Sequence, residues 1–289
     1  MPQHPAAPED FPGLVEAYRQ ATQAVIDLGH SCSDADFDRP TAAPGWTVKD
    51  QVSHVVGLES WMRSGSQPRV EVPDYPHVRN ELGRFTEVAV EQRRRVRGDK
   101  VVAELETVLA QRMDDLTGGP DATEPVDSTR VVRTPLGDRP LIDALRIRTL
   151  DIWTHEQDIR QALGRPGDLD SGGAAVFVDV LFSVFPRLVA RDAAVPPGNV
   201  VILEVTGPVK GRAGVWVEQS DDGLPRGIPL FSGVAHDGDP DDVFTTITAS
   251  TDAVTRRAAG RGTVDDIHWT AQGDEHVARR VLENLVFVS

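Results

Sequence analysis

The stretch RTLDIWTHEQDIRQALG, residues 148–164, places an acid and an imidazole one helical turn apart in a segment otherwise built like a core helix. Successive residues of a helix turn by about 100°, so Asp151 and His155 project from the same face. Trp153 and Ile159 indicate that much of this helix is buried. A buried acid and imidazole need a partner or a metal to offset their lost hydration.

Capping signals and apolar spacing predict four helical regions in the first half of the chain, at about 10–29, 45–62, 80–116 with an interruption near 97–100, and 141–163. Thr47 can cap the second region together with Asp50, which follows three residues later. His54 lies on the second turn of this region, among valines. Four helices with long connections predict an antiparallel bundle.

The second half changes character after a helix at about 172–192. Short β-branched runs bounded by glycine, proline and aspartate predict strands within 196–207, 211–219, 244–250 and 265–274, and helices are expected at 250–262 and 274–287. The acidic loop 235–242, AHDGDPDD, does not match a calcium-binding loop and is expected to be a turn. The pattern predicts an α+β fold on an antiparallel or mixed sheet, with domains at 1–168 and 169–289.

Composition limits the function classes. The 289 residues include 30 basic and 45 acidic side chains, and the net charge of −15 repels nucleic acid and anionic membrane surfaces, so we expect neither as a partner. The most apolar run, residues 174–190, contains Asp179 and Pro186 and is expected to be a buried helix. The single cysteine, Cys32, excludes a disulfide framework within the chain, and the first residues lack the pattern of a signal peptide. We therefore expect a cytoplasmic protein.

An acid and a histidine four apart on a helix can offer two ligands to a divalent metal, and His54 is the best third ligand. The spacing alone is also typical of a surface or capping pair, and His54 alone is also typical of a core histidine bonded to a carbonyl group. Glu156 and Asp158, in the same stretch, are expected on a solvated helix face.

Two segments together carry a resemblance. APGWTVKDQVSHVVGLESW, residues 43–61, followed by LDIWTHEQDIRQALGRPG, residues 150–167, resembles the mycothiol-dependent maleylpyruvate isomerase family. The resemblance covers nearly the whole chain. It implies a DinB-like four-helix bundle with a divalent metal, usually zinc, and its ligands map onto His54, Asp151 and His155. The best-known isomerases have a glutamate where this chain has the shorter aspartate.

The resemblance also implies a smaller α+β, sterol-carrier-like domain with an arginine at the end of a helix, which maps onto Arg261 after Gly260. An arginine there could equally complement the helix dipole. Three protein ligands leave a metal with an open position, and mycothiol is the thiol of the family. The implied enzyme is an isomerase or S-transferase in which a metal-bound thiolate attacks a small electrophile such as maleylpyruvate. Arg261, or a neighbour such as Arg256 or Arg257, would hold the carboxylate of this substrate.

Two alternatives remain at the level of the sequence: a non-catalytic protein that binds a small ligand and retains a metal site, and a metal-dependent hydrolase. Cys32 lies outside both ligand segments, so we do not expect it to be the nucleophile. The expected partners are a small-molecule substrate and a low-molecular-weight thiol, in a monomer or small homo-oligomer.

Overall fold

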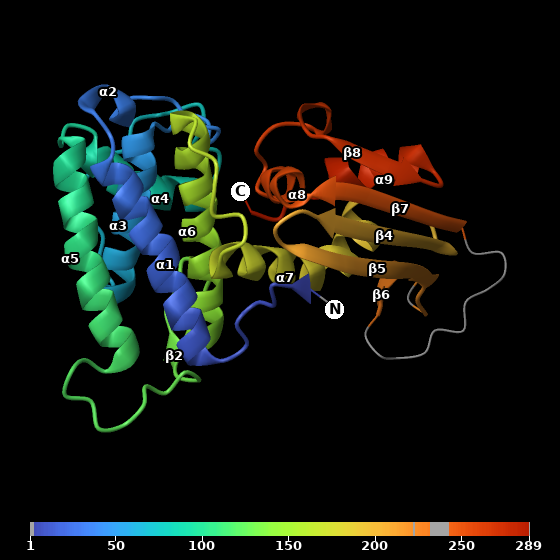
Figure 1. Ribbon diagram of the computed structural model, residues 1–289, viewed down its shortest axis with the longest axis horizontal. Helices are drawn as coiled ribbons and strands as arrows, with labels where there is room; N and C mark the ends of the chain where they lie inside the picture. Colours follow the sequence, from blue (N-terminus) through green and yellow to red (C-terminus); the bar gives the residue numbers. More distant parts are fainter. Residues whose placement is uncertain (1–2, 222, 232–242, 289) are drawn as a thin grey trace. The chain divides into compact units, whose positions relative to one another are not determined.

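The computed structural model describes residues 3–221, 223–231 and 243–288. The chain divides into two compact units: a helical domain, Pro8–Gly167, and a sheet domain, which joins Met1–Ala7 to Asp168–Ser289. Figure 1 shows the helices of the first and the strands and helices of the second. The α+β class predicted from the sequence is confirmed.

The helical domain follows the predicted order of helices. Its helices are α1 (Phe11–His30), α2 (Asp34–Phe37), α3 (Val48–Ser64), α4 (Glu81–Arg93), α5 (Gly98–Thr117) and α6 (Leu141–Leu163). The interruption predicted near 97–100 is confirmed, because α4 and α5 are separate helices. A short antiparallel ribbon of β2 (Val131–Val132) and β3 (Arg139–Pro140) precedes α6 and was not predicted.

Caps set where α3 begins and where α6 ends. The Thr47 hydroxyl accepts the backbone N–H of Asp50, and the Asp50 carboxylate accepts the backbone N–H of Thr47 at 3.0 Å. Helix α6 ends at Gly164, whose φ of 65° is the left-handed conformation that glycine adopts without strain. The first cap fixes the start of α3 and therefore which of its faces carries His54.

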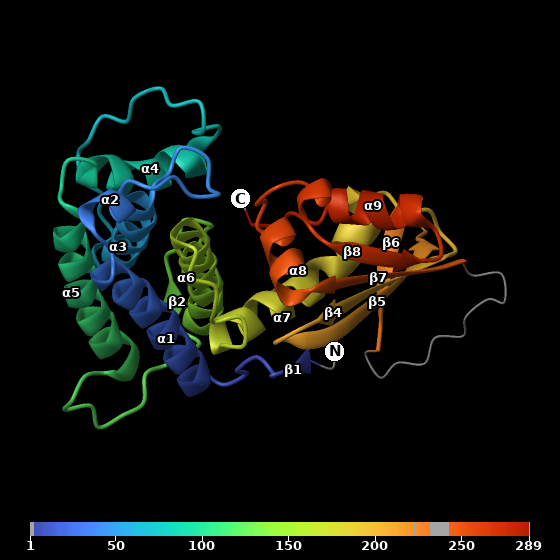
Figure 2. The same ribbon diagram turned by 45° about the horizontal axis from the view of Figure 1, so that its top comes forward.

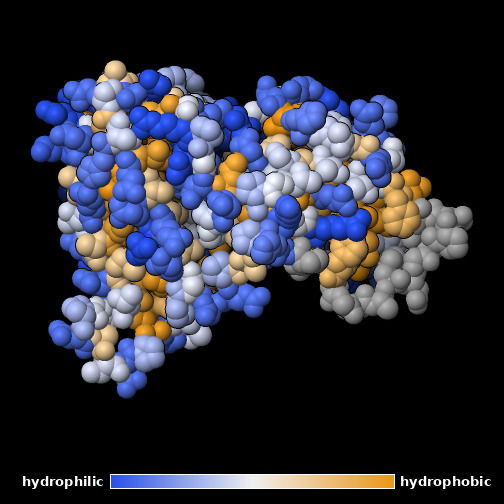
Figure 3. All heavy atoms as spheres, in the orientation of Figure 1, coloured by the Kyte–Doolittle hydropathy of each residue, from blue (hydrophilic) through white to orange (hydrophobic). Residues whose placement is uncertain are grey.

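Helix α3 lies in the middle of the helical domain. It packs against α4, α5 and α6, while α1 packs along α5 and α6 (Figure 2). Val48, Val52, Val55 and Val56 are completely buried, and burying each such side chain contributes about 1.5–3 kcal/mol relative to exposure. On the face drawn in Figure 3, hydrophilic side chains predominate at the surface of this domain and hydrophobic ones gather between them. The polar residues where α3 meets α6 are therefore enclosed by an apolar core.

The sheet domain contains one mixed sheet. Its strands are β1 (Gln3–His4), β4 (Asn199–Thr206), β5 (Lys210–Gln219), β6 (Pro225–Leu230), β7 (Val243–Ser250) and β8 (Trp269–Gln272). The order is β1-β5-β4-β7-β8, with β6 also paired to β5, and only β4 and β7 run parallel among the described pairs. Helices α7 (Gly172–Arg187), α8 (Thr251–Ala258) and α9 (Glu275–Glu283) pack against its strands.

Two strands of this sheet were not predicted. Strand β6 contains Pro225 and Pro229, which lack the backbone donor that a central strand needs, but among the described strands β6 pairs with β5 alone. Strand β1 is two residues long and pairs with the start of β5. The acidic stretch at 235–242, expected to be a turn, lies outside the described residues.

The helix predicted at 172–192 is present as α7 followed by a π-helical turn, Leu188–Asp192. It is long and apolar enough to cross a membrane by length and composition alone, but 67% of its most apolar window is buried within the protein. A largely buried apolar helix is typical of the core of a globular domain, as the sequence predicted.

Candidate metal centre

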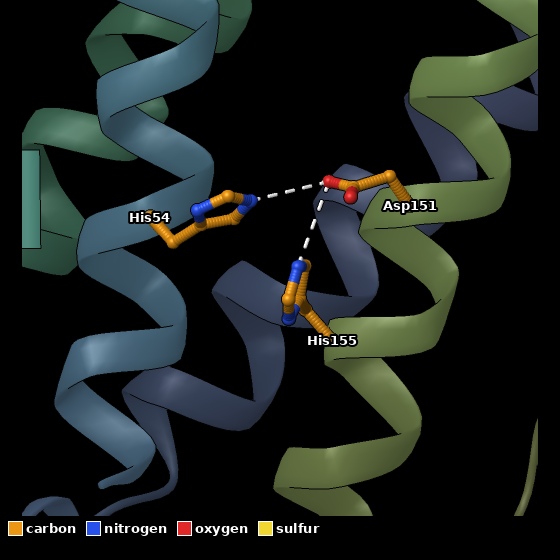
Figure 4. A group of neighbouring side chains, drawn as sticks. All are labelled: His54, Asp151 and His155. Carbon is orange, nitrogen blue, oxygen red and sulfur yellow. Dashed lines mark hydrogen bonds and ion pairs between the residues drawn. The ribbon is translucent and has the colours of Figure 1, made fainter. Parts of the chain in front are cut away.

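The side chains of His54, Asp151 and His155 converge between two helices of the helical domain. His54 comes from α3, and Asp151 and His155 lie one turn apart on α6. The Oδ2 atom of Asp151 lies 3.3 Å from Nε2 of His54 and 3.6 Å from Nε2 of His155. Figure 4 shows both imidazole rings directed at this carboxylate. One ligand atom from each residue lies within 4.8 Å of the other two.

This donor set has the chemistry and the spacing of a divalent metal site. Zinc binds imidazole nitrogen and carboxylate oxygen at about 2.0–2.2 Å in a tetrahedron, which places neighbouring ligand atoms roughly 3.4 Å apart. The separations of 3.3 and 3.6 Å from Asp151 to His54 and His155 lie close to this value. Two of the three ligand-atom separations thus match a tetrahedral site, and all three lie within 4.8 Å.

Burial keeps the imidazole of His54 neutral, and the His155 ring is buried beside it. His54 is 4% exposed and His155 is 6% exposed, whereas the side chain of Asp151 retains 22% of its exposure. The Trp46 ring lies against both imidazoles, with centroids 5.0 Å from His54 and 5.8 Å from His155. Burial, with the nearby His155, lowers the pKa of His54 to about 4. His54 therefore presents an uncharged ring at neutral pH, as a metal ligand must.

The tautomer of His155 is set by Gln51. The carboxamide nitrogen of Gln51 donates to the Thr41 hydroxyl at 2.7 Å and lies 3.4 Å from Oδ2 of Asp158, so its oxygen points the other way, at Nδ1 of His155. An amide oxygen can only accept, so Nδ1 carries the proton and the lone pair of Nε2 faces Asp151. By contrast, Nδ1 of His54 is buried without a hydrogen-bond partner among the described residues.

The carboxylate of Asp151 is held ionised. Burial raises its pKa, but the Arg148 guanidinium, which donates to Oδ2 from Nη1 at 2.6 Å, holds the pKa of Asp151 well below its usual value. Arg148 and Asp151 thus form a salt bridge, and its acid is a member of the candidate site.

One local prediction on α6 is wrong. Glu156 and Asp158 were expected on a solvated face, but Glu156 is completely buried and Asp158 is 3% exposed. Helix α6 packs against α1 and α3 on different sides, so little of its surface meets water. Glu156 pairs with Arg160 at 2.6 Å, and Asp158 lies 3.9 Å from Nδ1 of His155. Asp158 is therefore part of the polar surroundings of the site.

Sequence reasoning also missed Gln51 as a functional residue. Its position three residues before His54 places the two on neighbouring parts of one helix face, which is the signal that could have found it. Trp46 is a second residue of these surroundings, because its ring packs on the two imidazoles.

The predicted residues outside this cluster have local roles in the structure. Arg261 follows Gly260, whose φ is 71°, at the end of α8; it is 9% exposed, and its Nη1 donates to the Ala259 carbonyl at 2.8 Å. It belongs to the sheet domain, and its role towards a substrate stays a prediction. Cys32 follows α1 and donates to the Leu28 carbonyl, and burial, with the nearby Asp36, raises the pKa of its thiol.

Comparison with known proteins identifies the family of the helical domain. Residues 18–160 match the model of the mycothiol maleylpyruvate isomerase N-terminal domain family. Two uncharacterized proteins of Mycobacterium tuberculosis, from strains CDC 1551 and H37Rv, are each 25% identical over 154 residues, which are 53% of this chain and 69% of theirs.

Two solved structures share the fold. They are crystal structures of the mycothiol-dependent maleylpyruvate isomerase and of a histidine-to-alanine mutant of it, with TM-scores of 0.51 and 0.52 and identities of 16% and 17%. Each comparison covers 91% of this chain and 93% of the other. The segment matched by the family model contains His54, Asp151 and His155, and this helical domain of the chain belongs to the mycothiol maleylpyruvate isomerase N-terminal domain family.

Proposed function

We propose that this protein is a metal- and mycothiol-dependent enzyme that isomerises, or transfers a thiol to, a small electrophile bearing a carboxylate, such as maleylpyruvate. The observation that carries the proposal is the convergence of His54, Asp151 and His155 inside a domain of this family. The same three residues are the proposed metal ligands, and their two imidazoles and one carboxylate suit zinc.

The three proposed ligands would give a metal an incomplete coordination shell. Three protein ligands leave one tetrahedral position for an external group, and the exposed part of the Asp151 side chain is where such a group can approach. A metal held by these three ligands would lower the pKa of an external thiol at the open position and keep it as the nucleophilic thiolate. Gln51 holds the His155 ring with Nε2 free, and the buried His54 stays neutral.

The burial of the site suits addition of a thiol to a conjugated double bond. In a cis-trans isomerisation the substrate's double bond must be converted temporarily to a single bond, about which the molecule can rotate. Reversible addition of a thiolate achieves this conversion. A transferase releases the same adduct as product. Trp46 and the buried imidazoles exclude water from one side of the reacting centre. We assign the substrate carboxylate to Arg261, because a guanidinium binds a carboxylate through two parallel hydrogen bonds.

Metal analysis combined with an assay for thiol dependence tests this function. The purified wild-type protein is expected to hold one divalent metal per chain and to convert maleylpyruvate only when mycothiol is added, and His54→Ala is expected to lose both properties. Wild-type protein without bound metal would point to a small-ligand-binding protein. Metal-dependent turnover that needs no thiol would point to a hydrolase.

The remaining assignments follow from this proposal and from the composition. Both substrates are small molecules, and the net charge of −15 disfavours nucleic acid and anionic membranes. A low-molecular-weight thiol is a reagent of the cytoplasm, where we place the protein. We propose a monomer or a small homo-oligomer, which the mass measured by light scattering in solution will decide.

A further inference from the structure

A buried network of charged residues leads from the interior of the helical domain to the candidate metal site. At its centre is Glu59 of α3, which is completely buried. Its Oε2 accepts hydrogen bonds from Arg112 of α5 at 2.8 Å and from the Tyr18 hydroxyl of α1 at 2.9 Å. Its Oε1 accepts from Nε of Arg148, on α6, at 2.7 Å. Four helices of the domain therefore meet at this one carboxylate.

Arg148 connects this network to Asp151. Its Nε binds Glu59 and its Nη1 binds Oδ2 of Asp151 at 2.6 Å, the same oxygen atom that faces the two imidazoles. The side chain is 5% exposed, and its Nη2 is buried without a hydrogen-bond partner among the described residues. One edge of the guanidinium is thus held by Glu59, and another edge donates to Asp151.

We propose that Arg148 is a positioning residue that holds Asp151 in the orientation in which it binds the metal. The inference rests on the proposed function, because it concerns the same site. An unrestrained aspartate at 22% exposure can rotate its carboxylate towards water and away from His54 and His155. A charge-assisted hydrogen bond from an anchored guanidinium selects one rotamer and aims Oδ2 at the space between the two rings.

The bridge needs an arginine. Arg148 donates to two carboxylates from different atoms of one rigid plane, and the single ammonium of lysine cannot reproduce that geometry. The bridge also explains why a short acid can serve here, because the position of Oδ2 is set both by the backbone of α6 and by Glu59 across the helix interface.

Arg112 offers a matched control. It is 5% exposed, donates to the other oxygen of Glu59, and does not reach Asp151 in the contacts of the described residues. Replacing either arginine by methionine leaves Glu59 with one guanidinium partner, so the cost to folding is of the same kind for both variants. Only Arg148→Met also removes the hydrogen bond to the proposed metal ligand.

The test measures the dissociation constants of Zn²⁺ and Co²⁺ by competition with a chelating dye, and the visible absorption of the Co²⁺ form, for the wild type and both variants. Arg148→Met is expected to weaken metal binding about 10- to 100-fold, the effect typical of losing a group that orients a ligand, and to change the Co²⁺ spectrum. Arg112→Met is expected to stay within about threefold of the wild type in affinity, with the same spectrum.

The other outcomes would overturn either the positioning role of Arg148 or the proposed function. Wild-type affinity in folded Arg148→Met, or equal losses in both variants, would refute the positioning role while leaving the metal site intact. If Arg148→Met does not fold, Arg148→Lys keeps the charge without the bridge, and wild-type metal affinity in that variant would refute the role equally. A wild-type protein that binds neither metal would overturn the proposed function and this inference with it.

Discussion

The carboxamide oxygen of Gln51 accepts a hydrogen bond from Nδ1 of His155 and thereby turns the lone pair of Nε2 towards Asp151. The two residues are far apart in the sequence and meet only because α3 and α6 pack side by side. This contact makes one imidazole a defined donor before any ligand arrives, which lowers the cost of ordering the ring on binding.

Gln51→Met is expected to weaken metal binding about 10- to 100-fold, because methionine fills a similar volume but offers His155 no strong acceptor. A chelator competition titration measures the change. Ser53→Ala is the control, since Ser53 is equally buried on α3 and its hydroxyl binds only the Lys49 carbonyl within its own helix among the contacts described. If Gln51→Met binds metal as tightly as Ser53→Ala, the tautomer assignment of His155 is wrong.

The metal-free protein is expected to lose stability as the pH falls from about 7 to 5. Burial lowers the pKa of His54 from 6.5 to about 4, so the unfolded chain binds a proton in this interval that the folded chain does not. The free energy of unfolding is therefore undiminished above about pH 6.5 and decreases as the pH falls towards 4. The decrease amounts to about 2 kcal/mol between pH 7 and 5 for a shift of this size.

Urea unfolding of chelator-treated protein at several pH values measures this effect, with His54→Gln as the comparison. The variant carries no titrating group at this position, so its stability should change less with pH than that of the wild type. Parallel curves for the two proteins would show that His54 does not carry the pH dependence.

The sequence predicted the triad because the spacing of Asp151 and His155 defines one helix face before any tertiary contact is known. It could not predict the network behind them. Arg148 stands three residues before Asp151, but its other partner, Glu59, lies on a different helix and is brought near only by packing. The burial of Glu156 and Asp158 was missed for the same reason, because a polar face looks solvated until a neighbouring helix is known to cover it. In the sheet domain, the prolines of β6 hid a strand that tolerates them at an edge.

Cys32→Ser is expected to keep most of the thiol-dependent activity. The thiol lies in the turn after α1, donates to the Leu28 carbonyl, and has a pKa raised by burial and by Asp36, all of which disfavour a reactive thiolate. Turnover with added mycothiol, together with metal content, measures the effect. A complete loss of activity in a folded variant with normal metal content would show that the protein supplies its own nucleophile.

Arg261→Lys tests whether the sheet domain orients the substrate. If Arg261 holds a substrate carboxylate through a two-pronged contact, lysine is expected to lower kcat/KM by one to two orders of magnitude, about 1.4–3 kcal/mol of transition-state stabilisation, with metal content and Tm unchanged. If Arg261 only completes the end of α8 through the Ala259 carbonyl, lysine retains a donor for that contact and turnover stays the same.

Arg257 separates the two readings, because it lies in the last turn of α8, just before Arg261, and its guanidinium donates to the backbone carbonyls of Leu282, Gly262 and Glu283. Arg257→Lys cannot make all three contacts and is expected to lower Tm, by about 2–4 °C for each kcal/mol lost in a chain of this size, while kcat/KM measured well below that Tm changes little. A fall in kcat/KM that accompanies Arg261→Lys but not Arg257→Lys would place the guanidinium of Arg261 on the substrate. Full turnover by Arg261→Lys on a carboxylate-bearing substrate would restrict Arg261 to the end of the helix and leave the substrate carboxylate to another cation.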